Sequence, residues 1–281
     1  MSATVFIAVL FAAAMHAGWN AMLKVALDRV RSMLLLTLAM GGFGVAMLAV
    51  VAWPAPASFG FVIASAIIHS GYKLFLIRAY DAGDLSQVYP LARGTAPLLT
   101  TFAAFYVVGE VLSPLMLAGV ALILIGIYLA GVHGGSRRAA MNAPAILFAL
   151  ATSVFIAAYT IADGLGVRAS LSALGYTAAV FVADCILFST IVIAWRGRAI
   201  TRGIMRQWQA GVVAGALSLG SYAIALWAMT KAPIAAVAAL RETSILFALM
   251  LGAAWLGEAL SWPRIAAALV IVGGAAALRF G

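Results

Sequence analysis

The stretch Gly109-Glu110-Val111-Leu112-Ser113 recurs 148 positions later as Gly257-Glu258-Ala259-Leu260-Ser261. In each copy an apolar run of about twenty residues ends at Gly-Glu. A new apolar run then begins behind the serine and a nearby proline, as helix starts prefer. The sequence therefore predicts a duplicated protein in which each copy contains a helical hairpin.

The composition identifies the solvent of this protein as lipid. Of its 281 residues 66% are hydrophobic and only 9% are charged, which is more apolar sequence than a soluble core of this size could bury. The seventeen basic residues outnumber the eight acidic ones, but they cluster between the apolar runs. That distribution indicates membrane topology and not a nucleic-acid partner. The single cysteine, Cys185, excludes an intramolecular disulfide and a cysteine metal cluster.

Ten apolar segments are long enough to cross about 30 Å of hydrocarbon. They lie near residues 4–23, 32–53, 59–80, 85–108, 114–132, 144–164, 171–195, 208–229, 233–256 and 262–279. The linker Gly134-Gly135-Ser136-Arg137-Arg138 divides them five and five, which predicts one repeat in residues 1–133 and a second in residues 139–281. Because five is odd, the second repeat enters the membrane from the opposite side. We expect an all-α integral membrane protein made of two inverted five-helix repeats.

The basic residues between segments predict the orientation. Eleven lie in or beside connections on one face, and these are Lys24, Arg29, Arg31, Arg78, Arg137, Arg138, Arg196, Arg198, Arg202, Arg206 and Arg264. The opposite face has three, Arg168, Lys231 and Arg279. Since cytoplasmic connections carry the excess of basic residues, we expect both termini outside, in a multi-pass protein of a bacterial inner membrane.

These features together resemble the drug/metabolite transporter superfamily, and specifically EamA-type transporters. The resemblance rests on ten helices in two repeats and on the Gly-Glu-x-Leu-Ser hairpin, and it covers essentially the whole chain. It implies a secondary carrier, often an exporter of small metabolites, with a central cavity between the repeats. Many family members are drawn with both termini cytoplasmic, so the charge count departs from the family here. The segment His16-Ala17-Gly18-Trp19-Asn20 with Lys24 also resembles a subgroup linked to phosphonate utilisation.

Two arginines are the main candidates for substrate binding. Arg93 and Arg241 are also 148 positions apart and lie about eight residues into their segments, from opposite faces, so both are expected near the midplane. Two guanidinium groups there could hold a carboxylate, phosphate or phosphonate by bidentate hydrogen bonds. The alternative is internal pairing. Glu242 directly follows Arg241, but adjacent helical residues point in different directions and are expected to meet third parties.

Polar side chains on other segments could also line the cavity. His69, Tyr72 and Lys73 share one helix face, and so do His16, Trp19 and Asn20. For His69 the alternative is packing and hydrogen bonding between helices. Lys73 could extend towards the helix end, and Trp19 could belong to an interfacial belt. Two tyrosines that could supply hydroxyl groups, or only pack helices, are Tyr89 and Tyr222.

Three residues are candidates for carrying a coupling proton: Asp184, Glu242 and His69. Asp184 lies deep within its segment, where a carboxyl group either takes up protons or forms a static ion pair with Lys73, Arg93 or Arg241. Asp163, four residues after Tyr159, is expected near a helix end and in contact with water.

The recurring glutamates, Glu110 and Glu258, lie at helix ends on opposite faces. We expect them to be structural, with hydrogen bonds to the start of the next helix, where the dipole attracts a carboxylate; gating is the alternative. Gly41-Gly42 with Gly44, and Gly273-Gly274, are expected to allow close helix packing.

The sequence therefore favours a secondary active transporter, more specifically an exporter, of an anionic or zwitterionic metabolite such as an amino acid, organic acid or phosphonate. The alternative is a lipid-carrier flippase of the same superfamily. The known enzyme motifs His-Glu-x-x-His and Gly-x-Ser-x-Gly are missing, as is a phosphate-binding loop, so we expect no enzyme, cofactor or metal. The expected partners are the substrate and the bilayer but no nucleic acid, and the protein is either a monomer or a homodimer.

Overall fold

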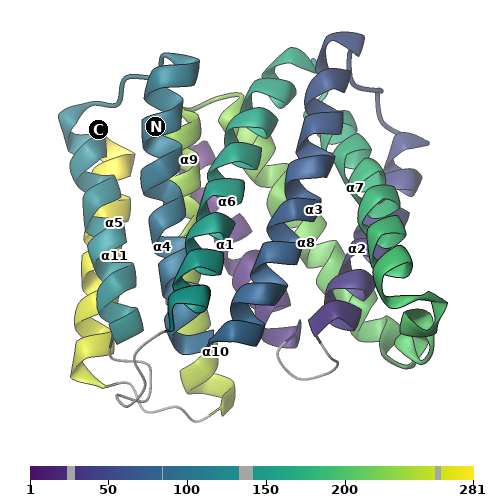
Figure 1. Ribbon diagram of the computed structural model, residues 1–281. Helices are drawn as coiled ribbons and strands as arrows, with labels where there is room; N and C mark the ends of the chain where they lie inside the picture. Colours follow the sequence, from purple (N-terminus) through teal and green to yellow (C-terminus); the bar gives the residue numbers. More distant parts are fainter. Residues whose placement is uncertain (24–28, 84, 133–141, 257–260) are drawn as a thin grey trace.

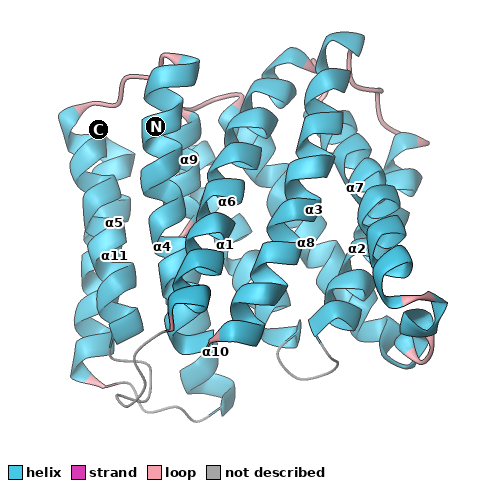
Figure 2. Cartoon of the chain, in the orientation of Figure 1, coloured by secondary structure: helices cyan, strands magenta, loops and turns pink. Residues whose placement is uncertain are grey.

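The computed structural model describes residues 1–23, 29–83, 85–132, 142–256 and 261–281, and every element in those ranges is helical (Figure 2). The first repeat contains α1 (Ala3–Leu23), α2 (Arg29–Leu48), α3 (Phe59–Ala82), α4 (Leu85–Ala103), which continues as a π-helical turn over Ala104–Val108, and α5 (Pro114–Val132). The second contains α6 (Ala143–Ala169), α7 (Ala173–Arg196), α8 (Trp208–Met229), α9 (Ile234–Arg241), α10 (Ser244–Leu256) and α11 (Trp262–Phe280). Short 3-10 turns cover Pro56–Ser58, Arg198–Thr201 and Ile204–Gln207.

These helices have the length and composition of membrane spans. In the described ranges nine stretches qualify, with α9 and α10 together forming one of 21 residues, Ile234–Ala254. The apolar part of α5, Pro114–Ala130, is slightly shorter. Large apolar side chains such as Ile7, Phe11 and Ile63 are exposed on the outer faces, as expected where lipid is the solvent. The predicted all-α membrane fold is confirmed.

The two repeats run in opposite directions through the layer. Arg279, near the end of α11, donates a 2.6 Å hydrogen bond to the carbonyl of Met1, so the chain begins and ends on one face. The second repeat begins on the other face, where Asn142 donates to the carbonyl of Ala82 at the end of α3. Packing follows the same symmetry (Figure 1), because α1 packs against α8 as α3 packs against α6, and α2 meets its counterpart α7 as α5 meets α11.

Two helix boundaries differ from the sequence prediction. The second helix ends at Leu48 and not near residue 53, and Pro54 disfavours helical geometry only in the residue directly before it. The sixth helix continues to Ala169 and not only to 164. Its glycines do not end it. An added Cβ on Gly164 would lie 2.4 Å from Ile234, and one on Gly166 would lie 2.2 Å from the hydroxyl of Tyr176, so both glycines serve close packing.

The segment predicted as one helix over 233–256 is divided into α9 and α10. The joint is Glu242-Thr243, where backbone hydrogen bonds reach back three residues, as from Thr243 N to the Leu240 carbonyl. The Thr243 hydroxyl also donates to that carbonyl, at 2.7 Å. Side-chain hydroxyl groups that bond to preceding carbonyls compete with regular helical bonds and bend helices. Arg241 therefore lies at the end of a short helix and not in the middle of a long one.

Glycines bring α2 and α7 close together. A Cβ on Gly41 would lie 2.4 Å from the Cβ of Cys185, whereas one on the neighbouring Gly42 would meet nothing within 4 Å. Gly41→Ala should therefore lower the free energy of unfolding by about 1–3 kcal/mol through overpacking. Gly42→Ala, the matched control, should leave it unchanged or raise it by up to about 1 kcal/mol. Unfolding in mixed micelles measures both, and equal effects would contradict the close contact.

Candidate functional site

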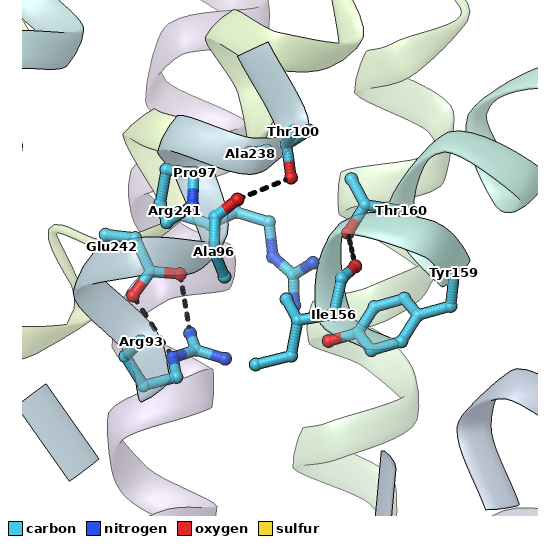
Figure 3. A pocket seen from close by; sticks show the side chains of 10 residues that line it. All are labelled: Arg93, Ala96, Pro97, Thr100, Ile156, Tyr159, Thr160, Ala238, Arg241 and Glu242. Atoms are coloured by element: carbon cyan, nitrogen blue, oxygen red, sulfur yellow. Dashed lines mark hydrogen bonds and ion pairs between the residues drawn. The ribbon is translucent and has the colours of Figure 1, made fainter. Parts of the chain in front are cut away.

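A small cavity lies between α4, α6 and α9, inside the membrane layer (Figure 3). Its lining residues are Arg93, Ala96, Pro97, Thr100, Ile156, Tyr159, Thr160, Ala238, Arg241 and Glu242. The volume is about 10 Å³, which is enough for about one water molecule. Both arginines predicted at mirrored depths thus line one cavity, which in this conformation is too small for a metabolite.

Arg93 is held by a carboxylate from the other repeat. Its Nη2 lies 2.8 Å from Oε1 of Glu242, and its Nε donates to Oε2 at 3.1 Å. Both side chains are buried. The two parallel contacts form the bidentate geometry that guanidinium and carboxylate groups favour. For Arg93 the structure therefore shows the internal pairing that the sequence left as an alternative. As expected, Glu242 pairs with a residue other than the adjacent Arg241.

Arg241 has no such carboxylate among the residues that the structure describes. Its Nε is buried without a hydrogen-bond partner, and its guanidinium carbon lies 5.2 Å from the centre of the Tyr222 ring. In Figure 3 the side chain extends between the Arg93–Glu242 pair and Tyr159. The position at the end of α9 adds the favourable end of a helix dipole for a cation. The cavity therefore contains two guanidinium groups and one carboxylate.

A second polar cluster surrounds Asp163, whose side chain is fully buried. The carboxylate accepts hydrogen bonds from the hydroxyl of Tyr176, at 2.9 Å, and from the hydroxyl of Tyr222. Nε2 of His69 lies 3.1 Å from Oδ2. The expectation of a water-exposed Asp163 was wrong, because α6 continues past Gly164 and places this residue six positions inside the helix.

The cluster and the cavity share aromatic walls. Tyr159, which lines the cavity, stacks on His69 with ring centres 4.1 Å apart. Tyr222 contacts Arg241 with its ring face and Asp163 with its hydroxyl group. Tyr72 meets Tyr159 edge to face, at 5.6 Å. Only single side chains separate the group around Asp163 from the arginines.

Lys73 does not extend to the helix end but forms a buried ion pair with Asp184. Its ammonium group also donates to the hydroxyl of Thr37, at 2.9 Å, and lies 4.6 Å from the ring centre of Phe188. Ser70 donates a longer bond to the same carboxylate, at 3.4 Å. Among the partners that the sequence left open for Asp184, the structure selects Lys73.

The α1 candidates contact one another within their own helix. His16 is buried and meets Trp19 edge to face, with the ring centres 5.0 Å apart. Asn20 donates to the backbone carbonyl of His16 at 2.9 Å, so its amide nitrogen serves the helix itself. Lys24, Glu258 and the side chain of Tyr89 lie outside the described part of the chain.

Glu110 lies on the face that carries the termini, but its hydrogen-bond partners differ from the expected ones. It does not bond to α5, the next helix; its Oε2 accepts from Ala235 N in the first turn of α9, at 3.4 Å. Its Oε1 lies 2.7 Å from Arg168 of α6. The same arginine donates to the carbonyls of Met229 and Ala232. Arg168 and Glu110 therefore tie together segments of both repeats on this face.

Sequence reasoning missed the roles of Tyr176 and Arg168. Each acts on a partner from another helix or loop, and neither residue differs in the sequence from an ordinary tyrosine or arginine at a helix end. Of the other predicted candidates, His69 and Tyr222 join Asp163, whereas Lys73 pairs with Asp184.

Comparison with known proteins gives one family and one fold. The model of the EamA-like transporter family matches residues 3–132 and again residues 143–280. No curated protein matches the sequence. Among 29 matching chains of solved structures, one titled "Crystal structure of protein" has a TM-score of 0.75. It is 20% identical, and the match covers 98% of this chain and 94% of that one. At that identity the likeness shows the fold alone.

Proposed function

Because the chain belongs to the EamA-like transporter family, we propose that it is a secondary active transporter of a small metabolite with an anionic group. The substrate class is a carboxylate or phosphonate, such as an amino acid or organic acid, and the expected direction is export. The observation that carries this proposal is the unpaired Nε of Arg241 in a cavity at membrane depth.

A charged side chain inside the membrane costs about 3 kcal/mol on insertion scales. Arg93 offsets this cost through Glu242, whereas Arg241 forms no ion pair among the described residues and lies against the ring of Tyr222. A substrate carboxylate or phosphonate would complete a bidentate contact at this guanidinium group. An uncharged or cationic substrate would leave the cavity with its excess positive charge.

Alternating access fits two features of the fold. The joint between α9 and α10 directly follows Arg241, and carriers with inverted repeats place such interrupted helices beside their substrate sites. The Arg168–Glu110 contacts join segments across the face that carries the termini. A metabolite can enter the cavity only when the repeats move apart, because about one water molecule fills it here.

Thermal stability of the purified protein in the presence of amino acids, organic acids and phosphonates tests this proposal. We expect an anionic compound to stabilise the native protein, and Arg241→Met to weaken its binding about 10- to 100-fold, the loss of a charged hydrogen bond. The control is Arg202→Met, which removes an exposed cation in the α7–α8 connection that does not line the cavity. Exchange of the same compound by proteoliposomes identifies transport.

Two results would count against the proposed transport of an anionic metabolite. Binding that survives in Arg241→Met would remove this residue from the site. Stabilisation by a polyprenyl phosphate, with no response to any water-soluble compound, would favour the flippase alternative.

A further inference from the structure

The buried carboxylate of Asp163 has no arginine or lysine beside it in the described structure. Its polar contacts are the two tyrosine hydroxyls and Nε2 of His69. Tyrosine hydroxyls stabilise a carboxylate by hydrogen bonds but bring no positive charge. A fully buried, ionised carboxyl group is costly unless it is paired or takes up a proton.

Among the described residues, neither Asp163 nor Arg241 forms a direct ion pair with a side chain of opposite fixed charge. Glu242 holds Arg93, and Asp184 holds Lys73. Tyr222 stands between the remaining two, with its hydroxyl group on Asp163 and its ring 5.2 Å from the guanidinium carbon of Arg241. Arg241 and Asp163 thus balance each other's charge through one shared side chain.

The titratable and charged groups around Asp163 come from several helices. His69 and Tyr72 belong to α3, and Tyr159, which contacts both rings, belongs to α6 itself. Tyr176 comes from α7 and Tyr222 from α8. Arg241 of α9 lies against Tyr222, and Arg93 of α4 lines the cavity together with Tyr159. The fixed charges in this set, Arg93 and Arg241, are both positive. Since Glu242 neutralises Arg93, a change in charge at Arg241 is the one that Asp163 senses most directly.

We propose that Asp163 is the proton-binding group of this carrier, with His69 as its hydrogen-bonding partner, and that a proton binds there together with an anion at Arg241. The second half of this proposal rests on the proposed function. An anion at Arg241 cancels the charge that balances Asp163, so the carboxylate gains a proton when the anion binds. Linkage makes the effect reciprocal, and acidification tightens anion binding. Proton and monoanion then cross the membrane together without net charge, and export proceeds while the outward gradient of the anion exceeds the inward gradient of the proton.

Infrared spectroscopy tests the proton site without any substrate. The carbonyl band of a protonated carboxyl group should appear reversibly as pH falls. It should be missing in Asp163→Asn, which keeps the side chain's shape, with an amide oxygen that accepts from one tyrosine hydroxyl and an amide NH2 that donates to the other. The band should persist in the matched control Asp184→Asn, which removes a different carboxylate, the one paired with Lys73. If Asp163→Asn fails to fold, Tyr222→Phe replaces it, and the band should then persist to higher pH because one donor to the ionised carboxylate is gone.

Acetate, the smallest carboxylate probe, tests the coupling. Saturating acetate should strengthen the band at constant pH in the native protein but not in Arg241→Met. Its apparent Kd should rise up to about tenfold per pH unit above the transition, and should be independent of pH in Asp163→Asn.

Each half of the proposal can be overturned separately. A band that is missing from the native protein, that survives in Asp163→Asn, or that does not move in Tyr222→Phe would overturn the proton site. A band that acetate leaves unchanged would overturn the coupling. Failure of the proposed function has a different signature, in which no anionic compound shows Arg241-dependent binding although the band of Asp163 still titrates.

Discussion

Replacing Lys73 by methionine is expected to lower the free energy of unfolding by about 3–5 kcal/mol, because Asp184 then stays buried as an uncompensated charge. The side chains of the pair are 7% and 2% exposed. The Thr37 hydroxyl also loses its donor, the ammonium group at 2.9 Å. Water cannot replace these contacts without opening the packing of α3 against α7. Unfolding in mixed micelles of increasing denaturing detergent measures the loss.

Two further variants separate the ion pair from simple packing. The double variant Lys73→Met with Asp184→Leu should recover most of the loss, since apolar residues often replace a buried pair at little cost. Arg29→Met removes one partner of the Arg29–Asp81 pair, whose side chains are 49% and 54% exposed, and should cost less than about 1 kcal/mol. A double variant as unstable as Lys73→Met alone would show that the lysine's packing, and not its charge, stabilises this region.

The spans and the shared depth of Arg93 and Arg241 could be predicted because the bilayer constrains both. Its thickness fixes the length of each apolar segment, and the recurrence at 148 positions relates helix to helix between the repeats. Once the second repeat is inverted, equal depths measured from opposite faces meet in the middle. The cavity between α4 and α9 follows from these constraints.

Which carboxylate pairs with which cation could not be predicted from the sequence. The sequence places Lys73, Arg93 and Arg241 at membrane depth with Asp184 and Glu242, so hydropathy allows several combinations. Packing decides between them, since α3 lies against α7 whereas α4 lies against α9. Lys73 therefore meets Asp184, and Arg93 meets Glu242.

The Asp163 group was missed for a local reason. The sequence prediction ended this span at residue 164, but in the structure the helix continues, and Gly164 and Gly166 make room for Ile234 and Tyr176. A glycine that ends a helix and a glycine that admits a neighbouring side chain are the same residue in the sequence. Only the position of α7 and α9 distinguishes the two roles.

Replacing Glu242 by glutamine is expected to destabilise the protein by about 3–5 kcal/mol, and by more than Arg93→Met does. Glu242 is the only carboxylate among the residues that line the cavity. Without its charge the two guanidinium groups repel each other in a medium that screens them poorly. In Arg93→Met, by contrast, Glu242 keeps a cation nearby, because Arg241 lines the same cavity and its Nε has no partner.

Rescue by an added anion distinguishes this explanation from a general packing defect. Acetate should raise the unfolding midpoint of Glu242→Gln more than that of the native protein, because it supplies the missing carboxylate between Arg93 and Arg241. In the double variant Arg93→Met with Glu242→Met, where only one guanidinium group remains, acetate should raise the unfolding midpoint no more than in the native protein. Equal losses in Glu242→Gln and Arg93→Met, with no acetate rescue, would mean that Arg241 does not share the charge of Glu242.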